Sequence, residues 1–456
     1  MGARSRTGAA CAAPPSPRPV ASRPRSAAAG MRPPSGAAFL IVSLLGCSAN
    51  DSRPAADAVV RDSAGVAIVE TRAPAWREPG EGWRVAPEPT LQIGMLEGEA
   101  PYLFDRIMGL VRFEDGVIAV GTMGAGSIRY FDANGRFLRE AGRAGRGPGE
   151  FPQLMGMKRL PGDAILAEAG GGMEVRMNVY DKRGRFVRDF SARREVGPDG
   201  RWSPVGWFDD GTAVAATYPQ RAPDGSTGVV VDSSTFTLFD GTAYGPPLLK
   251  LPAVMWSDGA DPRRLRLEFG PALAVVVAGS RFYYSFAADP DVLVFRVETD
   301  VNTGQRGFAL ERVLRGAWQR TPVTEADIAA FKHAYTGGAS GEDGQPASPQ
   351  LIELRRSNLE RMSFADHFPA HGRMMVDRTG AVWLERYTPS APTGGWNATR
   401  DEPSVWEVYD ADGVWLGPVE LPGDFIAREV GADYVLGLWR DENDVEFVRL
   451  YELSRD

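Results

Sequence analysis

Cysteine is nearly absent from this chain of 456 residues. Only Cys11 and Cys47 occur, both near the N-terminus. The chain after Cys47 therefore has no thiol to form a disulfide or to ligate a metal. Its folded part must be stabilised by burial of a hydrophobic core, for which 43% hydrophobic residues are available.

Lysine is also scarce, since the 51 basic residues include only Lys158, Lys182, Lys250 and Lys332. We interpret the excess of arginine as the mark of a GC-rich genome. Residues 1–46 hold six arginines and no acidic residue, so the chain from residue 47 onward has 45 basic and 59 acidic residues, a net charge of −14. An acidic chain without a basic stripe argues against a nucleic-acid partner.

Histidine is equally rare, and the common catalytic motifs are missing. Pro369 lies between His367 and His371 and favours extended chain over the helix that a metal-binding pair would need. No Gly-x-Ser-x-Gly or His-Glu-x-x-His motif occurs. Asp105, Asp377 and Asp424 lie at expected strand ends, where we favour turn capping over convergence on a metal. We expect no catalytic residue, no metal site and no cofactor.

The first 46 residues have the pattern of an export signal. Arginine-containing chain precedes a short apolar core at residues 36–46, which is too brief to span a membrane. Met31 is an alternative start for this signal, which would make residues 1–30 an extension. The core ends in Leu44-Leu45-Gly46-Cys47, which resembles the lipobox of bacterial lipoproteins. The resemblance implies lipidation of Cys47, and Ser48 resembles the sorting signal for the outer membrane. Residues 47–57 are interpreted as a tether.

A hairpin pattern recurs along the rest of the chain. Two apolar runs flank a tight turn in six places, a pattern that predicts β-hairpins: 111–120, 157–167, 206–215, 275–284, 374–383 and 428–436. A second hairpin follows each one, and several carry an aromatic–acid pair before the turn, as in Tyr130-Phe131-Asp132 and Val179-Tyr180-Asp181. Two hairpins make a four-stranded unit, and six such units predict an all-β, six-bladed β-propeller over residues 58–456.

The two ends of this region complement each other. The sixth unit stops at Asp456 before its last strand, whereas residues 88–94 resemble an outer strand without its own unit. From Gly98 onward this early segment matches the next one at a constant offset of 47 residues. We therefore expect residues 88–94 to pair with the strand near 448–453 and close the ring. A pair of β-sandwiches is the alternative fold, but it predicts no such complementarity.

The segment Gly142-Arg-Ala-Gly-Arg-Gly-Pro-Gly-Glu-Phe151 resembles the strand connector of NHL-repeat propellers and of the bacterial six-bladed β-propeller lipoproteins. Val60-Arg-Asp-Ser-Ala-Gly-Val-Ala-Ile-Val-Glu70 also resembles the start of that lipoprotein family. The resemblance implies an exported propeller anchored to the cell envelope, in the outer membrane of a Gram-negative organism.

Residues 318–368 interrupt the pattern between the fourth and fifth units. Thr324 and Ser348-Pro349 are typical helix starts and predict two helices here. In a propeller this connector lies on the face that usually binds ligands, so the insertion is either a lid or a partner surface.

Three residues are candidates for ligand binding: Arg106, Trp202 and Trp396, because indole faces near a guanidinium can stack on sugars or peptide side chains. Packing between blades is the alternative for the tryptophans. The favoured function is non-catalytic binding of a peptide, glycan or envelope protein through the loops. A metal-dependent hydrolase or lyase of the NHL-like propeller kind is one alternative, and a structural subunit of an envelope complex is another.

Overall fold

The computed structural model describes residues 57–455, except for 79–80, 171–173, 194, 198–199, 220–227, 258–264, 338–347 and 390–400. The described residues belong to one compact unit, Pro54–Asp456. The predicted signal, the lipidation residue Cys47 and nearly all of the tether lie outside the described residues.

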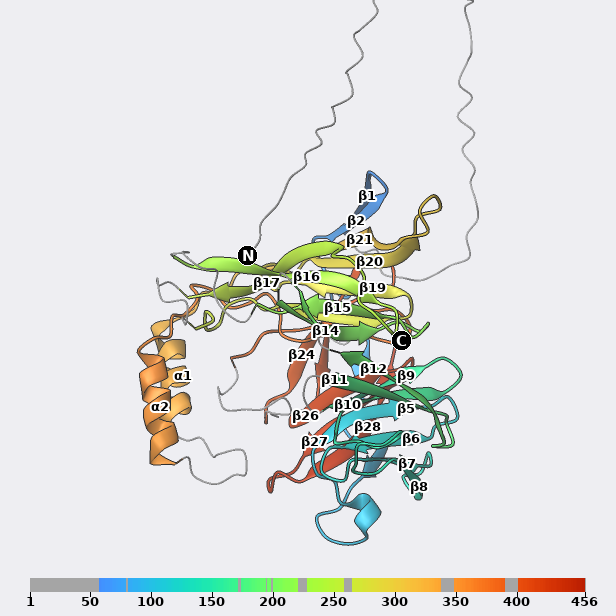
Figure 1. Ribbon diagram of the computed structural model, residues 1–456. Coiled ribbons are helices and arrows are strands. Elements are labelled where there is room, and N and C mark those ends of the chain that lie inside the picture. The colour runs from blue at the N-terminus through green and yellow to red at the C-terminus, as the bar shows by residue number, and fades with distance from the viewer. Residues whose placement is uncertain are drawn as a thin grey trace, which may run out of the picture. The chain divides into compact units, whose positions relative to one another are not determined.

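Six sheets account for most of the described chain, and each is one blade; all pairs of their strands are antiparallel except β2 with β21. Figure 1 labels most of these strands. Blade 1 contains β5 (Ile107–Arg112), β6 (Ile118–Thr122), β7 (Ser127–Phe131) and β8 (Phe137–Ala141). Blade 2 contains β9 (Gln153–Leu160), β10 (Ala164–Gly170), β11 (Glu174–Tyr180) and β12 (Phe186–Arg193). Blade 3 contains β13 (Val196–Gly197), β14 (Gly200–Trp207), β15 (Ala213–Thr217), β16 (Val230–Phe239) and β17 (Leu249–Trp256).

Of the other three sheets, blades 4 and 6 include strands that are distant in sequence, whereas blade 5 does not. Blade 4 contains β18 (Ala274–Ala278), β19 (Arg281–Ser285), β20 (Val292–Thr299) and β21 (Arg306–Gly316), extended by β1 (Ala58–Ser63) and β2 (Val66–Thr71). Blade 5 contains β22 (Met374–Val376), β23 (Val382–Glu385), β24 (Ser404–Tyr409) and β25 (Trp415–Leu421). Blade 6 contains β26 (Phe425–Val430), β27 (Tyr434–Arg440) and β28 (Glu446–Ser454), completed by β3 (Arg84–Val85) and β4 (Leu91–Ile93).

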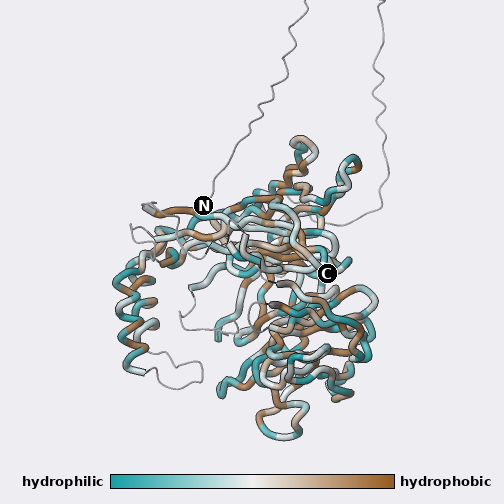
Figure 2. Tube along the Cα trace, viewed as in Figure 1, coloured by the Kyte–Doolittle hydropathy of each residue, from teal (hydrophilic) through white to brown (hydrophobic). Residues whose placement is uncertain are grey.

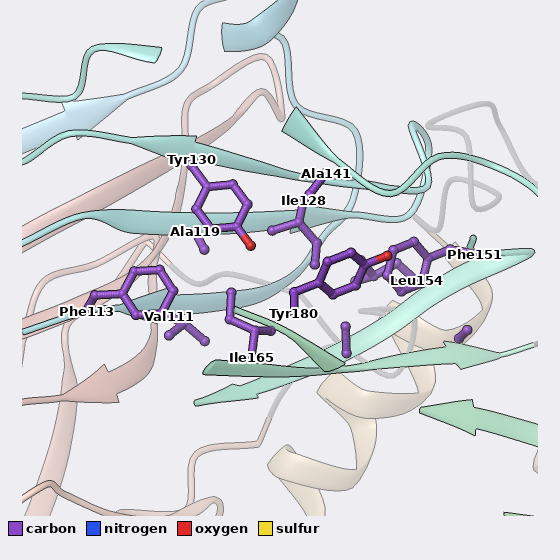
Figure 3. Close-up of a cluster of buried hydrophobic side chains, with 12 residues drawn as sticks. Val111, Phe113, Ala119, Ile128, Tyr130, Ala141, Phe151, Leu154, Ile165 and Tyr180 are labelled. Carbon is purple, nitrogen blue, oxygen red and sulfur yellow. The ribbon is translucent and has the colours of Figure 1, made fainter. Parts of the chain in front are cut away.

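Hydrophobic clusters join the blades into a ring. Each of six buried clusters combines side chains from two successive blades, and the last joins blade 6 to blade 1. In the cluster between blades 1 and 2, the Phe113 ring stacks on Tyr130 at 6.2 Å and the Phe151 ring on Tyr180 at 6.0 Å (Figure 3). The expected β-propeller is confirmed by this closed cycle of face-to-face sheets.

Burial explains the composition of the strands. The middle strands β6, β15 and β23 are buried at every position because both of their faces pack against neighbouring sheets. Such strands form continuous apolar runs, whereas the outer strand β8 alternates between half-buried and exposed residues. Figure 2 accordingly shows hydrophobic colour concentrated within the sheets.

The predicted closure of the ring is confirmed. β28 pairs antiparallel with β4, placing Val448 opposite Ile93 and Arg449 opposite Gln92. The same strand pairs further along with β3, where Leu453 lies opposite Val85. The N-terminal strands thus supply the outer edge that the last blade lacks, and they remove an open edge that could pair with other chains.

A second use of the N-terminal segment was not expected. β1 and β2 form a hairpin, and β2 adds to blade 4 in parallel with β21, with Val69 opposite Leu314. The chain then passes blade 5, where the Trp76 amide donates to the Leu416 carbonyl at 2.8 Å. We call residues 58–93 the strap, because they contact blades 4, 5 and 6 in turn.

Two connector types define two faces of the ring. The loop face carries the connections between the second and third strands of each blade and those from one blade to the next. The turn face carries the other hairpin turns, where Asp132, Asp181, Asp240 and Asp410 each accept a backbone N–H two residues later. Asp441 makes the same contact on the loop face, in the turn between β27 and β28. The aromatic–acid pairs seen in the sequence therefore cap turns, as do the residues at Asp441–Asp444.

The predicted helical insertion is confirmed on the loop face. α1 (Glu325–Gly337) starts after Thr324, whose Oγ1 accepts the Asp327 amide at 3.2 Å, and α2 (Pro349–Leu359) starts after Ser348, which caps the Leu351 amide. A short 3-10 helix, Ala100–Tyr102, precedes blade 1. The helices stand beside the sheets in Figure 1. An aromatic cluster fixes their base, because Phe269 contacts the rings of Phe331, Phe364 and Phe368 at 5.1–5.6 Å.

Deleting residues 58–95 should unfold the domain, because it removes the outer strands of blade 6 and the hairpin of blade 4. We expect loss of the cooperative thermal transition measured by circular dichroism. Deleting residues 48–56 is the matched control and should leave the melting curve unchanged. A cooperative transition at the original temperature in the longer deletion would contradict the proposed closure.

Candidate functional site

Arg106 lies on the loop face directly before β5, where the sequence placed it. Its side chain is 62% exposed and its Nε lies 3.3 Å from the Asp105 carboxylate. Its backbone has a φ of +55°, a conformation that costs a non-glycine residue free energy and often occurs at ligand sites. Asp424 has a φ of +54° at the equivalent position before β26. Arg106 is thus accessible, and its role in binding stays a prediction.

Of the two candidate tryptophans, only Trp202 lies within the described residues. Trp202 is only 6% exposed and its ring stacks on Tyr244 at 6.2 Å inside the cluster between blades 2 and 3. Its indole therefore packs in the core, the alternative that the sequence left open. Trp396 lies outside the described residues, as does Cys47, so both stay predictions.

β-Bulges in the inner strands give a feature that the sequence did not reveal. Several first strands of successive blades contact each other, namely β5 with β9, β14 with β18, β18 with β22, and β26 with β5. In β5, β9, β14 and β26 one residue is left out of the pairing register: Met108, Met155, Val205 and Arg428, respectively. Bulges reorient side chains and are frequent beside functional sites. Three of these four positions are apolar, and blade 6 alone among them has a charged residue there.

Arg428 belongs to a group of charged residues at the loop-face ends of blades 5 and 6. Burial, and next the nearby Arg373 guanidinium, lower the pKa of Arg428 below its usual range, while Glu446 raises it and Arg440 lowers it. We call Arg373, Arg428, Arg440, Glu385 and Glu446 the loop-face cluster. It holds three positive and two negative charges, and the exposed Asp444 carboxylate pairs with Arg440 at 2.7 Å at its rim. The excess of positive charge, which favours an anionic group, is therefore confined to the part of the cluster away from Asp444.

Both acids of the loop-face cluster are buried and already occupied. Glu385 receives two bonds from the Arg373 guanidinium, at 2.7 and 3.0 Å. Glu446 accepts the Arg440 guanidinium at 2.8 Å and the Ile107 amide of blade 1 at 2.6 Å. Charge-assisted bonds of this kind are strong and fix side-chain positions. The cluster is therefore organised without a ligand, which lowers the entropic cost of binding one.

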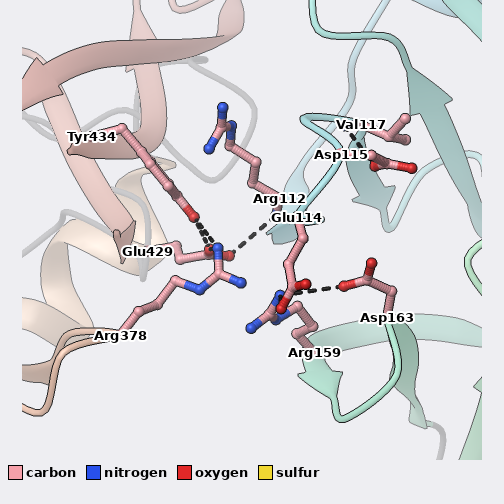
Figure 4. Close-up of polar contacts among 9 residues, drawn as sticks. All are labelled: Arg112, Glu114, Asp115, Val117, Arg159, Asp163, Arg378, Glu429 and Tyr434. Carbon is pink, nitrogen blue, oxygen red and sulfur yellow. Dashed lines mark hydrogen bonds and ion pairs between the residues drawn. The ribbon is translucent and has the colours of Figure 1, made fainter. Parts of the chain in front are cut away.

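At the opposite, turn-face end of the inner strands, acidic and basic side chains form a network of hydrogen bonds and ion pairs (Figure 4). On the turn face, the Tyr434 hydroxyl donates to Glu429 and accepts the Arg378 guanidinium at 2.9 Å. Glu429 also accepts the Arg112 amide at 3.2 Å, which ties blade 6 to blade 1. Arg159 lies 3.3 Å from Asp163 and 3.6 Å from Glu114. These acids and bases largely satisfy one another, so we assign this group to structure.

The aspartates at strand ends do not converge. Asp105 and Asp424 precede inner strands on the loop face, whereas Asp377 caps a turn on the other face by accepting the Thr379 and Ala381 amides. It also accepts the indole N–H of Trp383 and the Arg455 guanidinium. Within the described ranges, no group of three or more His, Cys, Asp and Glu side chains could hold a metal ion.

One buried pair has the composition of a catalytic dyad. His371 is 2% exposed, and its Nε2 lies 2.7 Å from the Ser285 hydroxyl. The Gly372 carbonyl can only accept, so Nδ1 donates to it at 2.9 Å and Nε2 accepts the serine proton. Ser285 is fully buried, so no substrate can reach it. The pair instead joins blade 4 to the approach to blade 5.

Comparisons with known proteins give no family for this chain. No protein-family model matches the chain, and no curated protein matches it. Many solved structures match with low identity. A protein of Bacteroides fragilis described as exported covers 85% of this chain and 99% of its own, at 11% identity and a TM-score of 0.44. A DUF4221 family member from Bacteroides vulgatus covers 82% and 99%, at 11% identity and 0.43.

An enzyme is also among the similar structures. The aldose sugar dehydrogenase of Streptomyces coelicolor, in its PQQ-bound form, covers 82% of this chain and 99% of its own, with 13% identity and a TM-score of 0.38. Similarity at this level carries no information on activity. Separately, no helix in the described part of the chain is long and apolar enough to cross a membrane.

The Ser285–His371 pair predicts acid sensitivity. Burial is the largest cause that lowers the pKa of His371 below 6.5, so the unfolded chain takes up a proton at a higher pH than the folded one. The stability from neutral His371 is present above pH 6.5 and is lost as the pH falls through the folded-state pKa.

We expect His371→Gln to lower the melting temperature at pH 7.5 and to flatten its decline between pH 7 and pH 5. His367→Gln, at an exposed position, is the control and should keep the wild-type slope; an unchanged slope in His371→Gln would refute the assignment.

Proposed function

We propose that this protein is exported, anchored to the cell envelope through lipidated Cys47, and binds an anionic partner through the loop face of its propeller without catalysing a reaction. The support for export and anchoring is in the sequence: arginines, then the apolar core of residues 36–46, then Cys47. Ser48 further favours the outer membrane as the destination.

The loop-face cluster carries the proposed binding function. Apart from the exposed Asp444, which pairs with Arg440 at the rim, Arg373, Arg428 and Arg440 exceed the two buried acids by one charge, although the chain as a whole is acidic. A local positive site on a negative protein attracts anions and discourages contact elsewhere. Because guanidinium groups bind carboxylates with paired hydrogen bonds, we favour acidic side chains of a peptide or envelope protein as the ligand.

The position of α1 and α2 agrees with a partner surface. Both helices belong to the connector between β21 and β22, which ends at Arg373 in the loop-face cluster. α2 has no buried residue, and Leu354 on it is 57% exposed. A helix that contributes so little to the core is available for contacts with another molecule.

Substitution of the lipidation residue tests the anchor. We expect Cys47→Ser to abolish incorporation of labelled fatty acid and to move the protein from the membrane to the soluble fraction, because stable anchoring depends on acyl chains. Wild-type partition of the Cys47→Ser variant into membranes would contradict anchoring through Cys47. It would not bear on the binding function proposed for the propeller.

A photocrosslinking amino acid at Arg106 tests the loop face in cells. We expect a discrete cross-linked partner from this position and none from Asn134, an exposed residue at the turn face of the same blade. Adding Arg428→Gln should weaken the cross-link about tenfold in partner titrations, since a hydrogen bond to a charged group contributes roughly 1.5–3 kcal/mol.

Two outcomes would overturn the proposed function. A cross-link from Asn134 equal to that from Arg106 would place the partner elsewhere. Stoichiometric Ca²⁺ or Zn²⁺ in the purified protein would favour the metal-dependent hydrolase or lyase instead, because those ions activate water or polarise a substrate.

A further inference from the structure

A cleft separates blades 4 and 5 on the turn face, away from the loop-face cluster. Strands β19, β20 and β21 form one wall, and two turns of blade 5, at Thr379–Gly380 and Asp410–Ala411, form the other. Its cavity volume is about 100 Å³, inside a wider opening of about 410 Å³ that includes open solvent. Because a cavity of roughly 150 Å³ holds benzene, this one admits only a small group.

Tyr283 presents an unused hydroxyl to this cleft. The residue is only 6% exposed, and its ring packs with Val294, Leu314 and Val382 in the cluster that joins the two blades. No group within the described ranges hydrogen-bonds to its hydroxyl. Burial raises the pKa of Tyr283, so the hydroxyl stays protonated and can donate. The hydroxyl oxygen itself is not among the buried atoms without a partner, so a ligand acceptor would replace solvent there.

The charges around the cleft leave one arginine uncompensated. Arg281 is held by Glu311 through two bonds of 3.0 and 2.9 Å. Asp410 uses one carboxylate oxygen to cap its own turn, where it accepts the Asp412 and Val414 amides. Arg312 donates to the Ala411 carbonyl at 2.6 Å and forms no ion pair with any described residue. Its remaining N–H groups are available beside the Tyr283 hydroxyl.

We infer that this cleft binds a carboxylate group attached to a small apolar body. The Arg312 guanidinium and the Tyr283 hydroxyl would hold the two carboxylate oxygens, and the apolar body would contact Val294, Leu314 and Val382. A fixed cation with a neutral donor suits a monoanion. The Asp410 carboxylate at the rim disfavours a dianion such as phosphate, because like charges repel at this range.

This site is independent of the proposed loop-face function, since the two share no residue and lie on different faces of the ring. Its carboxylate could come from a free small molecule or from the C-terminus of a peptide, because both present the same group.

Calorimetric titration of the purified mature chain tests the inference. The probes are phenylacetate, 4-methylpentanoate and the dipeptide acetyl-Leu-Phe, each compared with its amide and with inorganic phosphate. We expect at least one carboxylate to bind and its neutral amide to bind at least tenfold more weakly. Stronger binding of the two small acids would identify a free carboxylate as ligand, and stronger binding of the dipeptide would identify a peptide C-terminus.

Two variants give the test its specificity. Tyr283→Phe removes only the hydroxyl and Arg312→Gln removes the charge; each should weaken binding about tenfold without changing the melting temperature. Arg296→Gln is the control, because its guanidinium pairs with Glu298 outside the cleft, and it should bind as the wild type does. Equal binding of acid and amide, wild-type binding by Tyr283→Phe, or absence of binding by all three carboxylates would overturn the inference.

Discussion

The pairing of β28 with β4 is the interaction on which the rest of the structure depends. Each blade is a twisted sheet that is buried on both faces, so every blade needs two neighbours to bury its apolar residues. Only a closed ring gives every blade two neighbours. The contact of Ile93 with Val448, both almost fully buried, lies in the cluster that joins the last blade to the first. Without it, two sheet faces and two strand edges would be open to water at once.

The strap extends this closure beyond a single pair of strands. Trp76 and Trp83 pack at 5.7 Å, and Trp83 continues to Trp383 of blade 5 at 5.8 Å. The segment therefore contacts the outer edges of blades 4 and 5 before it completes blade 6. Contacts so distant in sequence are slow to form because loop closure costs entropy, so the ring becomes stable only when the whole domain has folded.

Much of this architecture could be predicted from the sequence, because turns and the alternation of apolar and polar residues along a strand are local features. The hairpin repeats, the helix starts at Thr324 and Ser348, and the strand near Leu91–Ile93 without its own blade were all visible. The docking of β1 and β2 on β21 was not, since alternation shows that a strand exists but not which edge it joins. Arg428 was missed for a similar reason. A bulge changes which residues face the interior, and an arginine in an alternating strand is otherwise assigned to solvent.

The two ends of the inner strands differ: on the turn face, Arg378, Glu429 and Tyr434 satisfy one another, whereas on the loop face the guanidinium groups of Arg373, Arg428 and Arg440 gather beside two buried acids. That division rests on closure in the stated register, which a designed disulfide measures most directly. Gln92→Cys with Arg449→Cys should oxidise completely in the native protein and raise its melting temperature, because opposed residues of antiparallel strands lie within disulfide range. The pair Gln92→Cys with Ser454→Cys lies several residues out of register and should stay reduced. Free thiols in the first pair under native conditions would contradict the closed ring.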